Sequence, residues 1–207
     1  MNKLKQLVIA TRNPSKLDYY RSILTGVACE VIGLGEMDIN GKPTETGQTA
    51  EENAEIKANY YLQRCGLPVF CEDEALYVDF LPESAQPGTH IRRINGVDEV
   101  DDDRLLQHWE AIIAKVPAKK RTGRWHIAYA LAVPNRKIRV LALDHPIMFF
   151  SPSSKVRLPG WPMSSLEGSV LFDKPNSEQT VTEKEIAKSR TAQELISSVK
   201  ELVQNTE

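Results

Sequence analysis

The order of apolar and polar positions predicts alternating strands and helices. An apolar run over residues 6–10 is typical of a buried strand. Asn13 and Pro14 follow it as helix N-cap and first helical residue, and apolar side chains then recur at helical spacing. We expect a second strand over residues 29–32 and a loop over residues 34–48, where glycines are frequent. This order is that of an α/β protein.

The next helix has a clear start signal. Thr49 and Glu52 have the spacing of a capping box, in which both side chains bond backbone N–H groups at the helix start. Gly66 is expected to end this helix. An apolar run over residues 67–71 then predicts a buried strand, and the acidic residues 72–74 are expected to begin where that strand stops.

The second half of the chain carries weaker signals, which come from short apolar runs and turn residues. We expect a polar segment over residues 81–103, a helix over 104–115, strands over 125–133 and 138–143 joined by a turn, a loop over 151–169 and a last helix over about 191–203.

Composition is that of an ordinary globular protein. The chain has 207 residues, 41% of them hydrophobic and 26% charged, enough for one large domain or two intimately packed lobes. The formal net charge of -2 gives no cationic field for long nucleic acid, so a nucleotide-sized anion would need a local cluster of cations. Three cysteines without a CxxC pair argue against a disulfide framework or a zinc site.

The sequence also bears on localisation. It has no run of about 18 apolar residues to span a membrane. The apolar part of the N-terminus is too short for a signal peptide. We therefore expect a cytoplasmic protein that does not bind a membrane.

The first candidate for chemistry is the loop over residues 11–16, which contains Thr11, Arg12, Asn13 and Lys16. A helix N-terminus presents unpaired N–H groups to a phosphate, and the arginine and lysine would add full charges. The alternative is an ordinary capped turn with two solvated cations.

Two further groups are candidates. Asn53 and Lys57 are one helical turn apart and share a face that can present a donor and a cation to phosphate, shortly after Glu45. Glu72 and Asp73 follow a buried strand, and carboxylates beyond the carboxyl end of a strand can hold Mg²⁺. The alternatives are a solvated lysine beside a surface hydrogen bond, and a solvated acidic loop.

In combination these motifs resemble the inosine triphosphate pyrophosphatase family, hydrolases that remove non-standard purine nucleotides. Residues 11–16 are similar to the family's T-G-N-x-x-K phosphate loop. Residues 45–58 match its E-T-G-x-T-x-x-E-N-A-x-x-K-A signature almost residue for residue. Residues 66–79 resemble G-L-P-x-x-x-D-D-S-G-L-x-V-D, and residues 87–96 resemble P-G-x-x-S-x-R-x-x-G.

The resemblance implies a fold and an activity. The fold is an elongated mixed β-sheet with flanking helices, with two lobes around a central cleft in one domain over residues 1–207. The activity is Mg²⁺-dependent hydrolysis of a nucleoside triphosphate to nucleoside monophosphate and pyrophosphate, in nucleotide-pool house-cleaning. The family also implies a homodimer.

The matched motifs imply residue roles. Glu45 and Asp73 would position Mg²⁺, and Asp73 aided by Glu72 would activate the water that attacks the α-phosphorus. Substrate contacts are implied for the residues that match or adjoin the family's other motifs: Thr11, Arg12, Asn13, Lys16, Asn53, Lys57, Lys184 and Arg190.

The chain departs from the family where the base is recognised. The family's F-G-Y-D-P motif falls near residues 165–169, which contain no aromatic residue and no aspartate, and Ser189 replaces the histidine of S-H-R. Arg12 replaces the glycine of the phosphate loop. We therefore predict that inosine triphosphate is not preferred in the family's usual way. Trp161 and Glu167 are candidates for a different base pocket. The alternative for Trp161, which we favour, is a loop anchor packed on the core.

Two alternatives stay open at this point. One is a hydrolase of the same fold that acts on a different standard or modified nucleotide. The other is a non-catalytic nucleotide-binding protein. The joint presence of Glu45, Asp73, Lys16 and Lys57 argues against a non-catalytic protein, because a site without catalytic activity need not retain its metal ligands.

Overall fold

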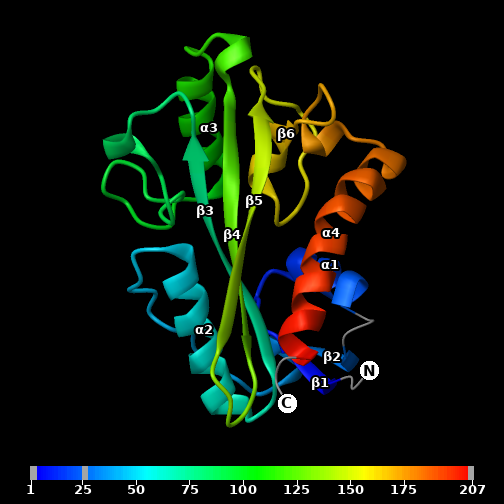
Figure 1. The fold of residues 1–207 in the computed structure, drawn as a ribbon. Coiled ribbons are helices and arrows are strands. Elements are labelled where there is room, and N and C mark those ends of the chain that lie inside the picture. Colours follow the sequence, from blue (N-terminus) through cyan, green and yellow to red (C-terminus); the bar gives the residue numbers. More distant parts are fainter. Residues whose placement is uncertain (1–3, 25–27, 205–207) are drawn as a thin grey trace. The chain divides into compact units, whose positions relative to one another are not determined.

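The computed structural model describes residues 4–24 and 28–204, which form a sheet with helices against it (Figure 1). The strands are β1 Leu4–Ile9, β2 Ala28–Gly33, β3 Val69–Val78, β4 Thr122–Ala132, β5 Arg139–Phe149 and β6 Glu167–Ser169. The helices are α1 Pro14–Leu24, α2 Ala50–Cys65, α3 Asp102–Ile113 and α4 Val181–Gln204. Short 3-10 helices are η1 Leu34–Glu36, η2 Glu83–Ala85, η3 Ala118–Lys120, η4 Pro162–Ser165 and η5 Asn176–Glu178.

The strand order makes β1 and β3 neighbours in the sheet. The order is β2-β1-β3-β4-β5-β6. β1 runs parallel to β2 and to β3, whereas β5 and β6 are antiparallel, so the predicted mixed sheet with flanking helices is confirmed. Ile9 lies opposite Phe70, and the N–H of Ala10 donates to the Phe70 carbonyl at 2.8 Å. The loop that follows β1 therefore begins beside the acidic residues that follow Phe70 in β3.

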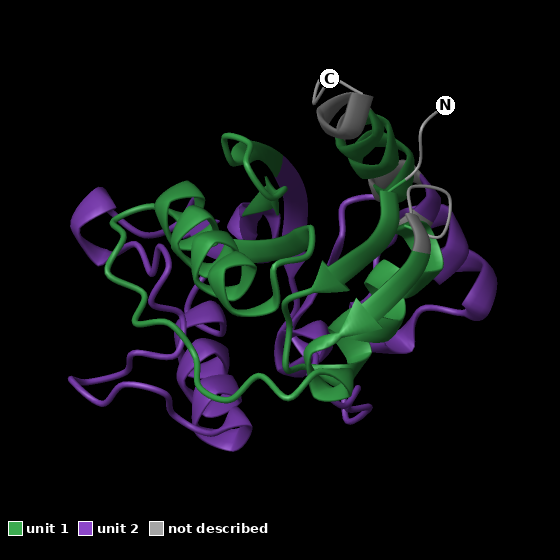
Figure 2. Ribbon diagram, turned by 90° about the horizontal axis from the view of Figure 1, so that it is seen from below, with its two compact units in different colours: residues 1–73, 127–143, 191–207 green, residues 74–126, 144–190 purple. Residues whose placement is uncertain are grey.

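The described chain divides into two compact units, which Figure 2 colours separately. Unit 1 comprises residues 1–73, 127–143 and 191–207, and unit 2 comprises residues 74–126 and 144–190. Each unit has its own apolar cluster. The single domain over residues 1–207 and the central cleft stay predictions.

The core of unit 1 holds α1 against the sheet. It buries side chains from α1, β1, β3, β4 and the last part of α4. Tyr20 of α1 meets Phe70 of β3 edge to face, with ring centroids 5.2 Å apart, and Phe70 stacks on Tyr129 at 5.9 Å. Such aromatic contacts add to the free energy of burying these large side chains. They place Tyr20 next to the part of β3 that carries the acidic residues.

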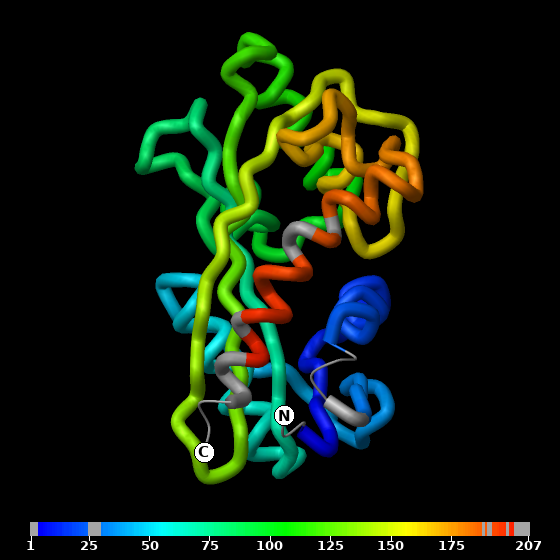
Figure 3. The backbone as a smooth tube through the Cα atoms, turned by 45° about the vertical axis from the view of Figure 1, so that its right-hand side comes forward, coloured from blue at the N-terminus to red at the C-terminus, as the bar shows by residue number. Residues whose placement is uncertain are grey.

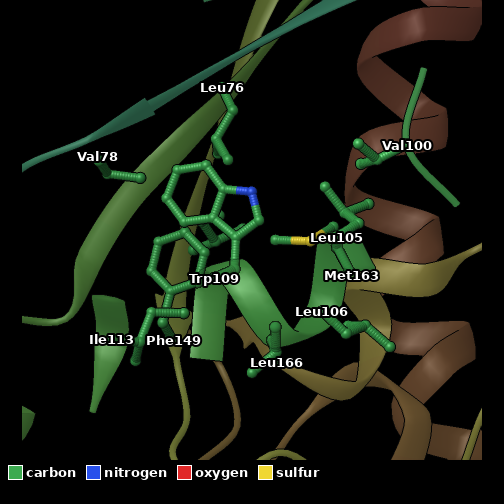
Figure 4. Packing of buried hydrophobic residues seen from close by; sticks show 11 residues of the cluster. Leu76, Val78, Val100, Leu105, Leu106, Trp109, Ile113, Phe149, Met163 and Leu166 are labelled. Atoms are coloured by element: carbon green, nitrogen blue, oxygen red, sulfur yellow. The ribbon is translucent and has the colours of Figure 1, made fainter. Parts of the chain in front are cut away.

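The core of unit 2 is centred on Trp109 of α3 (Figure 4). This indole is only 3% exposed and lies in one cluster with Leu76 of β3 and Phe149 of β5. Met163 and Leu166, from the segment before β6, complete the same cluster. Unit 2 therefore anchors the segment that leads into β6.

The predicted helix signals in unit 1 are confirmed. The Asn13 side-chain oxygen accepts from two backbone N–H groups of the first turn of α1, at 3.0 and 3.4 Å. The Thr49 hydroxyl oxygen accepts from the Glu52 N–H at 3.2 Å, which caps α2. Gly66 ends α2 with a φ of 66°, a left-handed conformation that glycine adopts without strain.

The predicted end of the strand over residues 67–71 is wrong. β3 continues to Val78 and carries Glu72, Asp73 and Glu74 within it. Leu76 and Val78 beyond the acidic residues are buried, so the strand has a core on both sides of them. Two of the acidic side chains are paired with lysines, as described below, and charge compensation allows carboxylates inside a buried strand.

The predicted boundaries of two later elements are also wrong. β5 continues past residue 143 to Phe149, and α4 begins at Val181 instead of near residue 191. The helix starts early because the Thr180 hydroxyl oxygen accepts from the Glu183 N–H at 3.2 Å, while the Glu183 carboxylate accepts from the Thr180 N–H at 2.7 Å. This is a capping box. None of the described helices is long and apolar enough to cross a membrane.

Candidate functional site

Strand alternation distributes the acidic residues of β3 over both faces of the sheet. Successive side chains of a strand point to opposite faces. Phe70 and Glu72 face α1, where they contact Tyr20. Cys71 and Asp73 face α2, since the Cys71 thiol lies 3.2 Å from the Ala54 carbonyl oxygen and Asp73 contacts Lys57. Glu72 and Asp73 are therefore neighbours in sequence with carboxylates in different surroundings.

On the α2 side, one ammonium group holds two carboxylates. Lys57 Nζ lies 2.7 Å from Asp73 Oδ2 and 3.2 Å from Glu45 Oε1, and it also donates to the Glu72 backbone carbonyl at 3.3 Å. Burial lowers the pKa of Lys57, but attraction to Asp73 and then Glu45 outweighs burial and holds that pKa above its usual value. The lysine is therefore charged, and two acidic groups from different segments meet at its ammonium group.

On the α1 side, Glu72 is held by a lysine and a tyrosine. Lys16 Nζ lies 2.6 Å from Glu72 Oε1, and the Tyr20 hydroxyl donates to Glu72 Oε2. Lys16 and Tyr20 are one helical turn apart and share a face of α1. Burial raises the pKa of Glu72, but Lys16 and the hydrogen bonds hold it below its usual value. Glu72 is therefore ionised although it is buried.

In the loop after β1, the side chains of Thr11 and Asn13 form hydrogen bonds within the loop and with the start of α1. The Thr11 hydroxyl oxygen accepts from the Asn13 N–H at 3.2 Å, and Asn13 caps α1. Arg12 Nη2 donates to the carbonyl oxygens of Gly41 at 2.6 Å and Ile39 at 3.4 Å. The structure thus places these predicted phosphate ligands beside Lys16, with Arg12 directed at a neighbouring loop.

Asn53 is buried and bonds the segment that carries Glu45. Its side chain is 2% exposed, and its Oδ1 accepts from the Gly47 N–H at 2.8 Å. A Cβ at Gly47 would lie 2.6 Å from this oxygen, so only glycine fits there. The substrate role predicted for Asn53 stays a prediction; its observed contact holds the loop before α2 in place.

The remaining predicted residues belong to unit 2. Lys184 lies in the first turn of α4, where its N–H donates to the Thr180 carbonyl at 2.9 Å. The side chain of Arg190 lies outside the described residues. Glu167 of β6 is buried and accepts from Trp125 Nε1 at 2.6 Å. Burial raises the pKa of Glu167 to about 8, with the Trp125 hydrogen bond opposing and the Glu74 charge adding to the rise.

The carboxylates of Glu45 and Asp73 fit a magnesium ion. Their oxygens approach the same ammonium group, so a cation already lies where they meet. The described residues contain no cluster of three or more His, Cys, Asp or Glu side chains suited to a metal. Mg²⁺ needs no such cluster, since it is usually bound by one or two carboxylates together with waters and substrate phosphates. The donor set is therefore sufficient for Mg²⁺ but not for a closed structural metal site.

Sequence patterns missed Tyr20, the third member of the Glu72 cluster. Tyr20 is one of the apolar positions that recur at helical spacing in this helix, and its ring lies in the core, where it is 3% exposed. Its spacing of four from Lys16 was the available signal, because residues one turn apart share a face. Burial, then the Glu72 charge, raises the pKa of the Tyr20 hydroxyl well above its usual value, so this group donates its proton in a hydrogen bond and keeps it.

Fold and site together define a class: a mixed α/β protein with two lysine–carboxylate pairs where β1 ends beside β3. The chain belongs to the Ham1 family, whose model matches residues 7–143. The resemblance found in the sequence motifs is therefore confirmed.

Curated relatives support the same assignment. The chain is 40% identical over 132 residues to a dITP/XTP pyrophosphatase of Symbiobacterium thermophilum, which covers 63% of each chain. It is 34% identical over 153 residues to a dITP/XTP pyrophosphatase of Geobacter sulfurreducens, covering 72% of this chain and 74% of that one. The match with the Symbiobacterium relative thus spans less than two thirds of its length.

Solved structures show the same fold over nearly the whole chain. A Ham1 protein of Coxiella burnetii superposes with a TM-score of 0.75 at 20% identity, covering 95% of this chain and 98% of that one. A Ham1 protein of Staphylococcus aureus gives a TM-score of 0.74 at 20% identity, covering 98% and 100%. At such identities the likeness concerns the fold alone.

Proposed function

We propose that the protein hydrolyses a nucleoside triphosphate to a nucleoside monophosphate and pyrophosphate, and so clears unwanted nucleotides from the cellular pool. The observation that carries the proposal is the convergence of Glu45 and Asp73 on Lys57, with the Lys16–Glu72 pair on the other face of the same strand. Two relatives are named dITP/XTP pyrophosphatases, which supports this class of activity.

The two lysines would bind the phosphate chain. Lys16 and Lys57 are both charged groups held in place by carboxylates, so neither needs to be ordered when substrate arrives. Charged hydrogen bonds to phosphate are stronger than neutral ones and do not depend on the base. We therefore assign triphosphate binding to this pair, with Thr11 and Asn13 shaping the loop and the helix start that precede Lys16 in α1.

The carboxylates would serve the reaction itself. Mg²⁺, held by Glu45 and Asp73, would neutralise charge on the phosphate oxygens. Asp73 would orient a water molecule and accept its proton. The water oxygen forms a bond to the α-phosphorus, the bond from this phosphorus to the bridging oxygen breaks, and that oxygen leaves with pyrophosphate. Glu72 would hold Lys16, since its carboxylate already binds that lysine and Tyr20.

A second candidate function is hydrolysis of a different standard or modified nucleotide by the same site. The segment over residues 165–169 favours it, because it lacks the family's aromatic and aspartate and instead buries Glu167 against Trp125. By analogy with the family we also propose a cytoplasmic homodimer that binds neither membranes nor long nucleic acid.

A panel of nucleoside triphosphates, assayed separately for pyrophosphate and orthophosphate with and without Mg²⁺, tests the proposal. We expect pyrophosphate and monophosphate in equal amounts, and no release in the absence of a divalent ion. Orthophosphate as the first product would indicate attack at the γ-phosphorus. Nucleotide binding without any release would favour a non-catalytic binding protein.

A further inference from the structure

The carboxylate of Glu45 is carried by a segment without regular structure. We call residues 37–49, between η1 and α2, the Glu45 loop; Figure 3 traces it from the blue β2 to the cyan α2. The Glu45 side chain is 44% exposed, and the ion pair with Lys57 spans 3.2 Å. Because one partner of this ion pair is exposed, the pair alone holds the loop only weakly. Other contacts must therefore fix where the carboxylate lies.

The end of the loop is bound to α2. The Gly47 N–H donates to Asn53 Oδ1 at 2.8 Å, and the Gln48 N–H donates to Glu52 Oε2 at 2.5 Å. A Cβ at Gly47 would lie 2.9 Å from the Asn53 backbone nitrogen, so the loop lies directly on the helix start. These contacts fix the loop on the C-terminal side of Glu45.

Arg12 supplies the matching contact on the other side. Its Nη2 donates to the carbonyl oxygens of Gly41 and Ile39, at 2.6 and 3.4 Å. Gly41 has a φ of 83°, and a Cβ there would lie 2.8 Å from the hydroxyl oxygen of Tyr60 on α2. The loop is thus held between Arg12 on one side and α2 on the other.

We propose that Arg12 is a positioning residue that ties the loop between β1 and α1, directly before Lys16, to the Glu45 loop, and so sets the place of a metal-binding carboxylate. The proposal rests on the proposed function for the role of Glu45, but the contact itself does not. A glycine at position 12, as in the family's phosphate loop, has no side chain to make it. The predicted role of Arg12 was phosphate binding, whereas its guanidinium is bonded to backbone carbonyl oxygens of the Glu45 loop.

The first test is hydrogen exchange of the wild-type protein and of Arg12→Ala and Arg12→Lys. Loss of a charged hydrogen bond to backbone should speed exchange at the Ile39, Gly47 and Gln48 amides by about fivefold or more. Arg12→Lys keeps the charge and should lie between the two. Arg136→Ala, which removes an exposed arginine from the β4–β5 turn of the same unit, is the matched control and should not change these amides.

The second test separates positioning from phosphate binding. In Arg12→Ala, the Mg²⁺ concentration for half-maximal pyrophosphate release should rise by about fivefold. The affinity for tripolyphosphate, measured in EDTA so that no divalent ion takes part, should stay within about twofold of the wild-type value. Unchanged exchange in the loop would overturn the proposal, and a large loss of tripolyphosphate affinity would assign Arg12 to phosphate. If the wild type released no pyrophosphate, the proposed function would fail, but the exchange data would still decide the role of Arg12.

Discussion

At the scale of single residues, the site depends on charges that are paired before any ligand binds. Lys16 and Glu72 are both largely buried, and so are Lys57 and Asp73. Removing one partner of a buried pair leaves the other uncompensated, which costs several kcal/mol. Substitutions here must therefore keep the volume and hydrogen bonds of the side chain, or neutralise both partners, if they are to report on catalysis.

Asp73→Asn is the most informative single substitution. It keeps the shape of a residue whose carboxylate is 7% exposed, but it removes the charge beside Lys57 and the group assigned to accept a proton from water. We expect kcat to fall by about 10²-fold or more, as when a metal ligand or general base is lost. Asp18→Asn on the exposed side of α1 is the control. A kcat near that of the wild type would refute the assignment.

Lys16 is expected to bind phosphate whichever base is attached. The double variant Lys16→Ala with Glu72→Gln removes the cation without leaving a buried carboxylate unpaired. Its triphosphate affinity should fall by roughly 1.5–3 kcal/mol compared with Glu72→Gln alone. Calorimetry with inosine, adenosine and guanosine triphosphates would measure this difference. A change that depended on the base would assign Lys16 to base recognition instead.

At the scale of elements, β6 carries a buried acid that makes unit 2 sensitive to pH. Burial raises the pKa of Glu167 from 4.5 to about 8, so the folded protein keeps a proton that the unfolded chain releases. This contribution to stability is fully present below pH 4.5 and is lost as the pH rises towards 8, by about 1.4 kcal/mol per pH unit.

Glu167→Gln tests this dependence. The amide keeps an oxygen acceptor for Trp125 Nε1 but cannot ionise. Relative to the wild type, the variant should gain stability from pH 5 to pH 8.5 in urea unfolding, with little difference at pH 5. Glu178→Gln, an exposed acid of the same unit, should show no such trend. Equal urea midpoints for wild type and Glu167→Gln at both pH values would contradict the account.

Helix boundaries marked by capping residues were predictable from the sequence. Boundaries that depend on tertiary contacts were not. Asn13-Pro14 and Thr49 with Glu52 marked the starts of α1 and α2 correctly. Thr180 and Glu183 have the same spacing and mark the start of α4 in the same way. The course of β3 was not predictable in this way, because a strand through three acids is stable only when lysines from α1 and α2 meet two of them.

The site was predicted in part. Glu45, Lys57 and Asp73 were grouped from motif spacing and family resemblance, and the structure brings them together. The sequence did not indicate that Glu72 and Asp73 face opposite helices, because residues 72–74 were expected to follow the strand, whereas they lie within β3. The direction of Arg12 depends on where the loop over residues 39–41 lies, which local patterns do not encode.

At the scale of the whole molecule, the family model matches residues 7–143, and the altered base motifs lie beyond that range. We predict that kcat/KM for inosine or xanthosine triphosphate is not greater than that for every standard nucleotide. Loss of base–aromatic stacking is worth about 1–3 kcal/mol. Trp161, four residues before the segment over residues 165–169 and 37% exposed, is the candidate replacement. A strong preference for inosine or xanthosine would show that the altered segment still recognises the same base.

The central claim is that water attacks the α-phosphorus, and the most direct test is to find which product contains the oxygen atom of that water. A single turnover in H₂¹⁸O, with Mg²⁺ and whichever nucleoside triphosphate is turned over fastest, is followed by mass spectrometry of both products. Attack at the α-phosphorus, directed by Asp73 and the lysines on either face of β3, predicts one ¹⁸O atom in the nucleoside monophosphate and none in pyrophosphate. Label in pyrophosphate or in orthophosphate would place the attack on another phosphorus and contradict the account.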